Sequence, residues 1–313
     1  KKARELMENV VICGAARTPI GGFQGAFDAV PAARLGGAAI EAALQQTSLS
    51  SVDEVVMGNV LGAGQGQAPA RQASFHAGLG AQVPATTLNK MCGSGMKATM
   101  IGFDQIALGQ TQVMAVGGME SMSNAPYLLP KMRGGARLGH SQVADHMFLD
   151  GLEDAYENGR LMGSFAEDCA EKYQFTREAQ DDYALRSLMR AREAQSSGAF
   201  ENEITPFNLA RKKGDYAVVQ DEQPLNAKPE KIPHLKPAFR ADGSVTAANA
   251  SSISDGAAAL ILSSQTHMQQ AGLPCRARIL GHASHAQEPA WFSTAPIFAT
   301  RKLLDRLNWR VED

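Results

Sequence analysis

Short apolar stretches alternate with helical patterns through the first third of the chain. Residues 10–12, 55–57 and 112–116 are mostly apolar runs that predict buried strands, whereas residues 32–46 and a segment from Pro69 have the pattern of helices. Strands that alternate with helices favour a mostly parallel sheet with helices packed on its faces. The sequence therefore predicts an α/β fold with a layered core.

The composition is that of an ordinary globular protein. The chain has 313 residues, of which 44% are hydrophobic and 20% charged, and its formal net charge is −2. This length is ample for a large core. The charge shows no excess of basic residues that would attract nucleic acid, and no tract of about twenty apolar residues would span a membrane. We therefore expect neither a nucleic-acid partner nor a membrane partner.

Four cysteines, at positions 13, 92, 169 and 275, show neither CxxC spacing nor a disulfide-dense pattern. The charged residues 1–7 lack the apolar core of a signal peptide. Both observations favour a reducing compartment, and we expect the protein to be cytoplasmic.

The texture of the sequence changes between residues 121 and 240, where polar and charged stretches surround two helical patterns at 165–174 and 176–197. Thr176 is expected to cap the second helix. After this segment the core pattern returns. The expected elements are a strand at 256–262, a short helix at 266–272, a strand at 277–280 and a helix at 295–306. The middle of the chain therefore reads as an insertion into the core.

Cys92 lies where a strand-like stretch, residues 84–89, leads through a turn of small residues into a helical pattern. The first turn of a helix offers free N–H groups and the positive end of the dipole, which favour a thiolate that attacks an acyl group. Gly93 and Gly95 would let a substrate approach the backbone closely. The alternative is that Cys92 is a small buried apolar residue, as most free cysteines are.

The segment 88–98, Leu-Asn-Lys-Met-Cys-Gly-Ser-Gly-Met-Lys-Ala, closely resembles the nucleophile motif of the thiolases, the family of acetyl-CoA acetyltransferases and 3-ketoacyl-CoA thiolases. Four further blocks resemble the same family in the same order. They are Arg-Thr-Pro-Ile-Gly at 17–21, the segment 62–72, Gly-Gly-Met-Glu-Ser-Met-Ser at 117–123, and the segment 245–251 together with 254–258. These blocks extend across nearly the whole chain, so we identify the chain as a member of the family.

The resemblance implies the thiolase fold, a layered α/β core with an inserted loop domain and a truncated second core half. We expect residues 1–120 to form the N-terminal core half and 121–248 the loop domain for CoA binding and tetramerisation. Residues 249–272 would return to the first half, and 273–313 would begin the second. The family's Asn-Glu-Ala-Phe, Gly-His-Pro and Cys-x-Gly blocks do not occur in the sequence.

Those blocks supply the family's activating histidine, an asparagine that positions a water, and a second cysteine that acts as acid and base. We therefore assign no catalytic His and no second catalytic Cys, and expect the 313 residues alone to be inactive. Cys13, Cys169 and Cys275 match no catalytic position in the family and are expected to be packing residues. His282 and His285 could share a metal ion, but no cysteine or carboxylate cluster surrounds them in the sequence, so no metal site is predicted.

The activity implied by the resemblance is acyl-CoA C-acyltransfer. In this reaction Cys92 would become acylated, and two acetyl-CoA molecules would condense to acetoacetyl-CoA, with thiolysis as the reverse. No cofactor is expected, since coenzyme A is substrate and product. Many relatives that prefer short chains have His-Met where this chain has Leu161-Met162, which leaves a 3-ketoacyl-CoA thiolase of fatty-acid β-oxidation open. A catalytically incomplete fragment is a further alternative. A ketoacyl synthase is disfavoured by the Asn-x-x-Cys-x-Ser-Gly pattern and the long insertion.

The resemblance also implies binding residues for CoA. Ser251 corresponds to a serine that contacts the pantetheine arm, and Ala247 and Ala248 leave room for that arm. Phe239 matches an aromatic residue near the CoA nucleotide, and Met162 matches a methionine that lines the acyl pocket. For Met162 and Phe239, ordinary packing is an equally good interpretation.

Residues 131–137, Lys-Met-Arg-Gly-Gly-Ala-Arg, resemble the loop that joins dimers into tetramers in short-chain thiolases. The expected partners are therefore acetyl-CoA, acyl-CoA and further copies of the chain, in a homotetramer built as a dimer of dimers. The alternative interpretation of this segment is a mobile surface hairpin.

Overall fold

The computed structural model describes residues 8–210 and 214–313. The charged segment 1–7, which the sequence predicts is not a signal peptide, lies outside the described residues. The chain forms two compact units. The first contains Lys1–Gly151, Arg192–Asn226 and Ile253–Ile279, and the second contains Leu152–Ala191, Ala227–Ser252 and Leu280–Asp313. The expected domain boundaries at residues 120, 248 and 272 stay a prediction.

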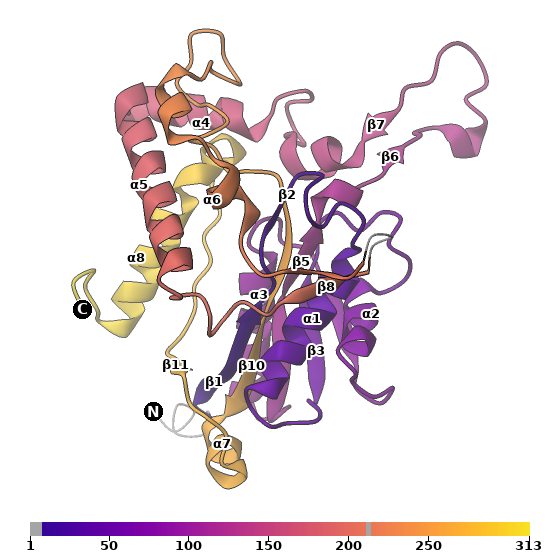
Figure 1. Cartoon of the computed structure of the whole chain (residues 1–313), viewed down its shortest axis with the longest axis vertical. Helices are drawn as coiled ribbons and strands as arrows, with labels where there is room; N and C mark the ends of the chain where they lie inside the picture. The colour runs from indigo at the N-terminus through magenta and orange to yellow at the C-terminus, as the bar shows by residue number, and fades with distance from the viewer. Residues whose placement is uncertain (1–7, 211–213) are drawn as a thin grey trace. The chain divides into compact units, whose positions relative to one another are not determined.

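A mixed sheet forms the centre of the first unit (Figure 1). Its strand order is β11-β1-β10-β5-β3-β4, and the short strand β2 also pairs with β10. The strands are β1 (Val10–Arg17), β2 (Gly21–Gly22), β3 (Glu54–Gly58), β4 (Ala85–Leu88), β5 (Val113–Ser121), β10 (Ser254–Ser264) and β11 (Ala277–Ile279). Each strand predicted from an apolar run is confirmed, and most extend a few residues beyond the run.

The expected mostly parallel pairing is wrong. Strand β3 pairs in parallel with β4 and β5, but β10 pairs antiparallel with both β1 and β5, and β11 pairs antiparallel with β1. The cause is the insertion of β10 between β1 and β5, where it runs opposite to both. An apolar run reveals a buried strand but carries no information about the direction of its partners.

Helices cover both faces of the sheet because successive strand residues point to opposite sides. Helices α1 (Ala32–Gln45) and α2 (Pro69–His76) pack on one face, whose strand residues include Val55 and Met57. Helix α3 (Ser94–Ala107) packs on the other face, where Val56 lies. The layered α/β core predicted from the sequence is therefore confirmed.

Smaller elements of the first unit include two hairpins and two short helices. The hairpin of β6 (Tyr127–Leu128) and β7 (Ala144–Asp145) extends away from the sheet at the upper right of Figure 1. In the second hairpin, β8 (Phe207–Leu209) pairs with β9 (Tyr216–Val218). The helices are α6 (Glu222–Asn226) and α7 (Gln265–Ala271).

Arg17, at the end of β1, ties the sheet to the chain segment that carries α6. Its guanidinium donates two hydrogen bonds to the carboxylate of Asp221, at 2.7 and 3.0 Å, and one to Glu203 at 2.6 Å. A two-pronged ion pair of this kind fixes both position and orientation. Asp221 also accepts the backbone N–H of Ile20 at 2.8 Å, which holds the turn after β1 in place.

The second unit is mainly helical. It contains α4 (Met162–Tyr173), α8 (Ala295–Leu307) and most of α5 (Arg177–Ser196), whose last residues belong to the first unit. These helices confirm the three predicted from residues 165–174, 176–197 and 295–306. The Thr176 hydroxyl accepts the N–H of Ala179 at 3.2 Å, so the predicted helix cap is confirmed.

Among the described residues, no helix combines the length and the apolar character needed to cross a bilayer. The four cysteines are all unpaired, and Cys13 is fully buried as expected. The prediction that Cys275 is a packing residue is wrong, since its side chain is exposed. It follows the short helix α7 in a surface connection, where no core residue is needed.

Candidate active site

Cys92 lies in a tight turn that joins β4 to α3. The hydroxyl of Ser94 donates to the carbonyl oxygen of Met91 at 2.5 Å and accepts the N–H of Lys90 at 2.9 Å. The side chain of Asn89 accepts the N–H of Met91 at 2.8 Å. Ser and Asn side chains stabilise turns in this way because they replace backbone partners. The turn buries Ser94 and leaves the thiol of Cys92 exposed.

Met91 has a backbone φ of +48°, in the left-handed region. This conformation is unfavourable for a side chain with a Cβ, at a cost of about 1–3 kcal/mol, and it persists only where neighbouring contacts enforce it. Here the side chain of Asn89, which bonds the N–H of Met91, and the hydroxyl of Ser94, which bonds its carbonyl oxygen, enforce this conformation. Met91 directly precedes Cys92, so its left-handed conformation turns the chain sharply and presents the thiol. The nucleophilic role of Cys92 remains a prediction.

Close backbone contacts seat the start of α3 against the sheet. A Cβ at Gly58, the last residue of β3, would lie 2.5 Å from the Cβ of Ser94, so only glycine fits there. Similarly, a Cβ at Gly118 in β5 would lie 3.2 Å from the Cα of Gly95. Gly95, which the sequence suggested would admit a substrate, therefore packs against the sheet. These contacts fix the helix end beside the thiol.

The neighbouring loop after β3 is fastened by a buried carboxylate. Glu120, near the end of β5, accepts the N–H groups of Val60 at 2.8 Å and Leu61 at 3.0 Å and the side-chain amide of Asn59 at 2.8 Å. Burial raises the pKa of Glu120, whereas the two backbone hydrogen bonds oppose that rise. The N–H of Asn59 donates to the carbonyl oxygen of Leu88, the last residue of β4. This loop therefore lies at the same end of the strands as the turn that carries Cys92.

His146 supports the same loop. Its Nε2 accepts the N–H of Ala63 at 3.3 Å, and its Nδ1 lies 2.6 Å from a carboxylate oxygen of Asp150. Accepting at Nε2 requires the proton on Nδ1, where it bonds the carboxylate. The side chain is buried, at 6% exposure. Neither His146 nor Glu120 was recognised from the sequence, because only the fold brings them to residues 59–63.

In the second unit, Met162 and Phe239 lie close together. Met162 is the first residue of α4, and the ring of Phe239 covers the next residue, Gly163. A Cβ on Gly163 would lie 2.3 Å from that ring, so the ring rests directly on the backbone of the helix. The structure therefore brings together two of the residues predicted to bind the acyl group and the nucleotide.

The remaining predicted CoA residues lie on one turn of the second unit. The N–H of Ala250 bonds the carbonyl oxygen of Thr246 at 3.0 Å, which closes a turn around Ala247 and Ala248. Ala247 and Ser251 are exposed, and Ala248 is half-buried. The turn therefore presents two small side chains and, just after it, a hydroxyl.

The structure thus places the predicted residues in two groups. Cys92 belongs to the first unit, whereas Met162, Phe239 and the turn with Ala247, Ala248 and Ser251 belong to the second. In the sequence, Ser94 appeared only as one residue of the motif around Cys92, yet its hydroxyl shapes the turn that carries the thiol. Its position at the start of a helix was the signal that could have revealed this role.

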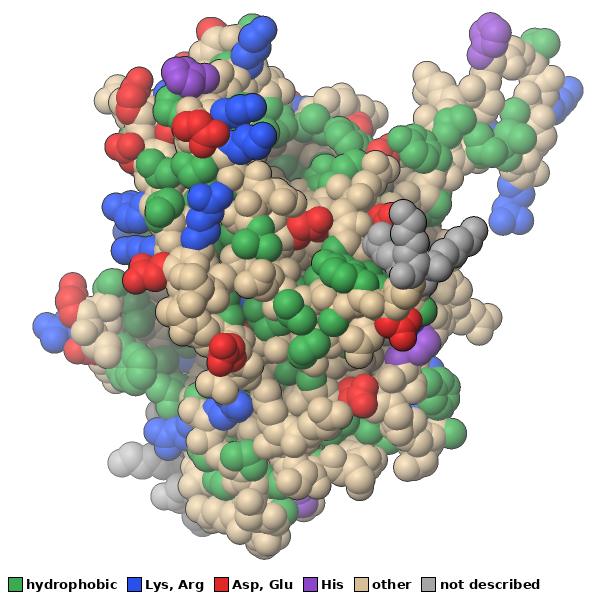
Figure 2. All heavy atoms as spheres, in the orientation of Figure 1, with side chains coloured by type: hydrophobic (Ala, Val, Ile, Leu, Met, Phe, Trp, Pro, Cys, Tyr) green, Lys and Arg blue, Asp and Glu red, His purple; other side chains and the backbone are tan. Residues whose placement is uncertain are grey.

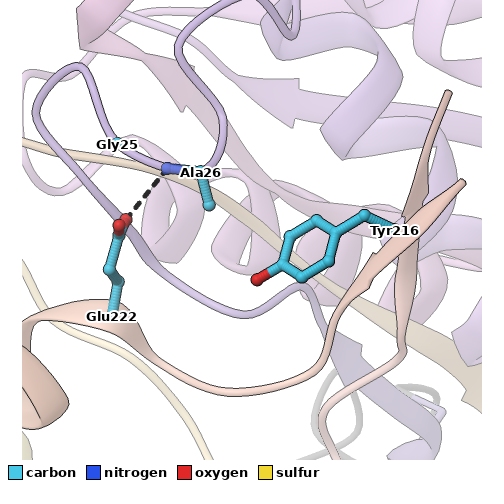
Figure 3. A pocket seen from close by; sticks show the side chains of 4 residues that line it. All are labelled: Gly25, Ala26, Tyr216 and Glu222. Atoms are coloured by element: carbon cyan, nitrogen blue, oxygen red, sulfur yellow. Dashed lines mark hydrogen bonds between the residues drawn. The ribbon is translucent and has the colours of Figure 1, made fainter. Parts of the chain in front are cut away.

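Two hollows have linings that include none of these residues. One, of about 420 Å³, is lined by Gly25, Ala26, Tyr216 and Glu222 (Figure 3). There the Glu222 carboxylate accepts the N–H of Ala26 at 3.1 Å, and it also accepts that of Gly22 at 2.8 Å. The other hollow, of about 460 Å³, lies in the second unit between α4 and residues 240–244. Within residues 8–210 and 214–313, no three His, Cys, Asp or Glu side chains gather as metal ligands would.

Comparisons with known proteins identify relatives of this chain. Residues 10–266 match the family model described as "Thiolase, N-terminal domain". A Pseudomonas aeruginosa protein named acetyl-CoA acetyltransferase is 48% identical over 310 residues, which cover 98% of this chain and 79% of that protein. A protein of Arabidopsis thaliana named acetyl-CoA acetyltransferase 2 is 49% identical over 95% of this chain and 74% of its own length.

The fold agrees as well. The crystal structure of the Bacillus anthracis acetyl-CoA acetyltransferase superposes with a TM-score of 0.94 at 38% identity, over 98% of this chain and 78% of that one. The structure of acetyl-CoA acetyltransferase from Syntrophomonas wolfei gives the same TM-score, identity and coverage of this chain. The family model over residues 10–266, and relatives that are 48–49% identical over most of their own length, show that the chain belongs to the thiolase family.

Proposed function

We propose that the protein is an acetyl-CoA C-acetyltransferase that works through an acyl-enzyme at Cys92. The observation that carries this proposal is the exposed thiol of Cys92 on a strained turn at the start of α3. It is supported by relatives that are named acetyl-CoA acetyltransferase and are 42–49% identical over most of their length. A helix N-terminus stabilises the negative charge that acyl transfer develops beside it.

The proposed reaction has two steps. In the first, the sulfur of Cys92 attacks the carbonyl carbon of acetyl-CoA, the thioester bond to CoA breaks, and the CoA thiolate leaves with the electron pair. In the second, the methyl carbon of another acetyl-CoA gives up a proton, which in the overall balance ends on the released CoA thiolate, and the carbanion attacks the acetyl group on Cys92. The bond between that group and the cysteine sulfur breaks, and acetoacetyl-CoA is released.

For CoA we propose binding through Ser251, Ala247 and Ala248 at the pantetheine arm, Phe239 near the nucleotide and Met162 near the acyl group. The support is their arrangement in the second unit, where small exposed residues share one turn and Phe239 adjoins Met162 through Gly163. The chemistry needs no metal and no redox cofactor, since a thioester exchange is nearly balanced and CoA is both substrate and product.

The test is an intact-mass measurement of the purified protein after incubation with acetyl-CoA. The expected result is the addition of one acetyl group, which is absent in Cys92→Ser and retained in Cys275→Ser, a matched variant at the other exposed thiol. Acetylation that survives in Cys92→Ser would refute the assignment of the nucleophile.

A 3-ketoacyl-CoA thiolase of fatty-acid β-oxidation is the second candidate, and Leu161 is the observation that favours it. Leu161 directly precedes α4 and is half-buried next to Met162, where an apolar side chain suits a longer acyl chain. Thiolysis rates for 3-ketoacyl-CoA substrates of increasing length separate the two candidates. A rate that falls steeply beyond acetoacetyl-CoA supports the acetyltransferase.

We further propose that a polypeptide confined to residues 1–313 does not turn over. The family's activating histidine and second cysteine have no counterpart among these residues, so carbanion formation lacks its base. The proposal would be contradicted if this polypeptide released acetoacetyl-CoA faster than its Cys92→Ser variant does.

The hairpin β6–β7 supports a proposed homotetramer. Figure 2 shows apolar side chains in green along this projection at the upper right. Among them, Leu129 is 55% exposed, Leu138 97% and Val143 59%. Large exposed apolar side chains on a projecting element are typical of an association surface. We also propose a cytoplasmic location, which the four unpaired cysteines support. Sedimentation of the protein and its distribution between cell fractions test these two statements.

A further inference from the structure

We propose that Asp181 and Asn249 are positioning residues that hold the turn at 246–251 in the shape that CoA requires. This inference rests on the proposed function, because that turn carries the residues assigned to the pantetheine arm. Asp181 lies on α5 and Asn249 lies within the turn, so the pair links the turn to a long helix of the same unit.

The amide of Asn249 is the internal support of the turn. Its oxygen accepts the N–H of Thr246 at 2.7 Å, and its nitrogen donates to the carboxylate of Asp181 and to the carbonyl oxygen of Ser244, both at 3.0 Å. The amide thus has partners on both sides, which fixes its orientation. An alanine or serine at this position could not make these three bonds.

The turn needs such a support because its other side chains provide little packing. Ala247 and Ala248 are small, and Ser251 is exposed. The hydroxyl of Thr246 adds two weaker bonds within the turn, accepting the N–H groups of Ala248 and Asn249 at 3.2 and 3.4 Å. A surface that leaves room for a ligand's arm must be held from the side away from the ligand.

Asp181 is itself rigidly held. It is only 7% exposed, and its second oxygen accepts Nε–H of Arg177 at 2.7 Å, one turn earlier in α5. The same guanidinium donates to the carbonyl oxygens of Ile232 and Leu235, at 3.0 and 2.9 Å. A carboxylate only accepts hydrogen bonds, so it faces two donors, the Arg177 guanidinium and the Asn249 amide. This polarity makes the pair testable by exchanging the two groups.

Four variants of the full chain test the pairing. Asn249→Asp keeps the shape and the acceptor for Thr246 but sets an oxygen against the Asp181 carboxylate. Asp181→Asn leaves one acceptor oxygen for two donors. In the double variant, the amide at position 181 can turn to donate to the carboxylate at 249 while its oxygen accepts from Arg177. Asp182→Asn makes the same chemical change at the exposed neighbouring residue and is the matched control.

Two measurements are needed, the dissociation constant for CoA by calorimetry and the hydrogen exchange of peptides that span residues 244–252. Each single variant is expected to weaken CoA binding about tenfold and to speed exchange in the turn. The double variant is expected to recover part of the lost affinity, because the pair is restored but the bond to the carbonyl oxygen of Ser244 is not, and Asp182→Asn is expected to match the wild type. A single variant that loses its fold while the double variant keeps both fold and affinity also supports the pairing.

The outcomes separate the inference from the proposed function. If the wild type does not bind CoA, the proposed function is wrong and the positioning role falls with it. If the wild type binds CoA and the single variants loosen the turn without changing the dissociation constant, the pair is merely structural and the inference is overturned. The inference is also overturned if the double variant is as weak as the two single effects combined.

Discussion

Replacing Gly58 by alanine is the sharpest test of how the fold presents Cys92. The new Cβ would lie 2.5 Å from the Cβ of Ser94 and 2.6 Å from its carbonyl carbon, whereas ordinary contacts begin at 3.4 Å. The start of α3 must therefore move by about 0.9 Å, because backbone rather than a flexible side chain stands in the way. That shift strains the bonds from Ser94 to Lys90 and Met91, now 2.9 and 2.5 Å long.

The expected cost has two parts. Overpacking and the weakened hydrogen bonds lower the free energy of unfolding by about 1–3 kcal/mol. The displacement of the thiol by nearly an ångström slows acetylation of Cys92 by about a hundredfold, since misplacement on this scale disrupts the attack geometry. Urea unfolding measures the first effect, and time-resolved intact mass with acetyl-CoA measures the second.

Gly62→Ala is the matched control, because its Cβ would meet only the side-chain oxygen of Asn59, at 3.8 Å. It should leave both quantities unchanged. If Gly58→Ala were acetylated as fast as the wild type, the close fit of β3 against α3 would have no part in positioning Cys92, and the reasoning would fail.

Three further predictions address other parts of the molecule. Burial, with a smaller contribution from Cys275, raises the pKa of Cys13 from 9.0 to about 11. As the pH rises, the unfolded chain therefore loses this proton before the folded chain does, and the free energy of unfolding should fall by about 2 kcal/mol between pH 9 and 11. Urea titrations at several pH values would measure this fall, which should be smaller in Cys13→Ala. Leu138→Asp on the exposed hairpin should lower the sedimenting mass without lowering the melting temperature; an unchanged mass would exclude the hairpin from assembly. Gly163→Ala should displace the ring of Phe239, weaken CoA binding about tenfold and lower the free energy of unfolding by about 1–3 kcal/mol. If calorimetry gives an unchanged dissociation constant for CoA, the ring of Phe239 is not part of the CoA site.

The order of strands and helices could be predicted from the sequence because it depends on local patterns. Apolar runs such as residues 55–57 and the glycine at the end of α7 carry their own signal. The direction of β10 could not be predicted, because pairing depends on partners far along the chain. Likewise, exposure of Cys275 depends on which side of the surface connection faces the solvent.

The site was predicted in part. The strand–turn–helix setting of Cys92 follows from local pattern, and its motif identified the family. The supports of the site could not be found in this way, since Glu120 holds residues 59–61 from another strand, and Asp181 holds Asn249 from a helix 68 positions earlier. Such side chains look like ordinary surface charges until the fold shows what they bond.

The central place of β10 has a consequence for how the protein is made. Ala257 of β10 bonds Thr18, a residue 239 positions earlier, and β10 separates β1 from β5. At a synthesis rate of 5–20 residues per second, the first strand leaves the ribosome roughly 12–50 seconds before its neighbour exists. During that interval the apolar edges of β1 and β5 have no partner, so the nascent chain depends on chaperones or on slow late closure of the sheet.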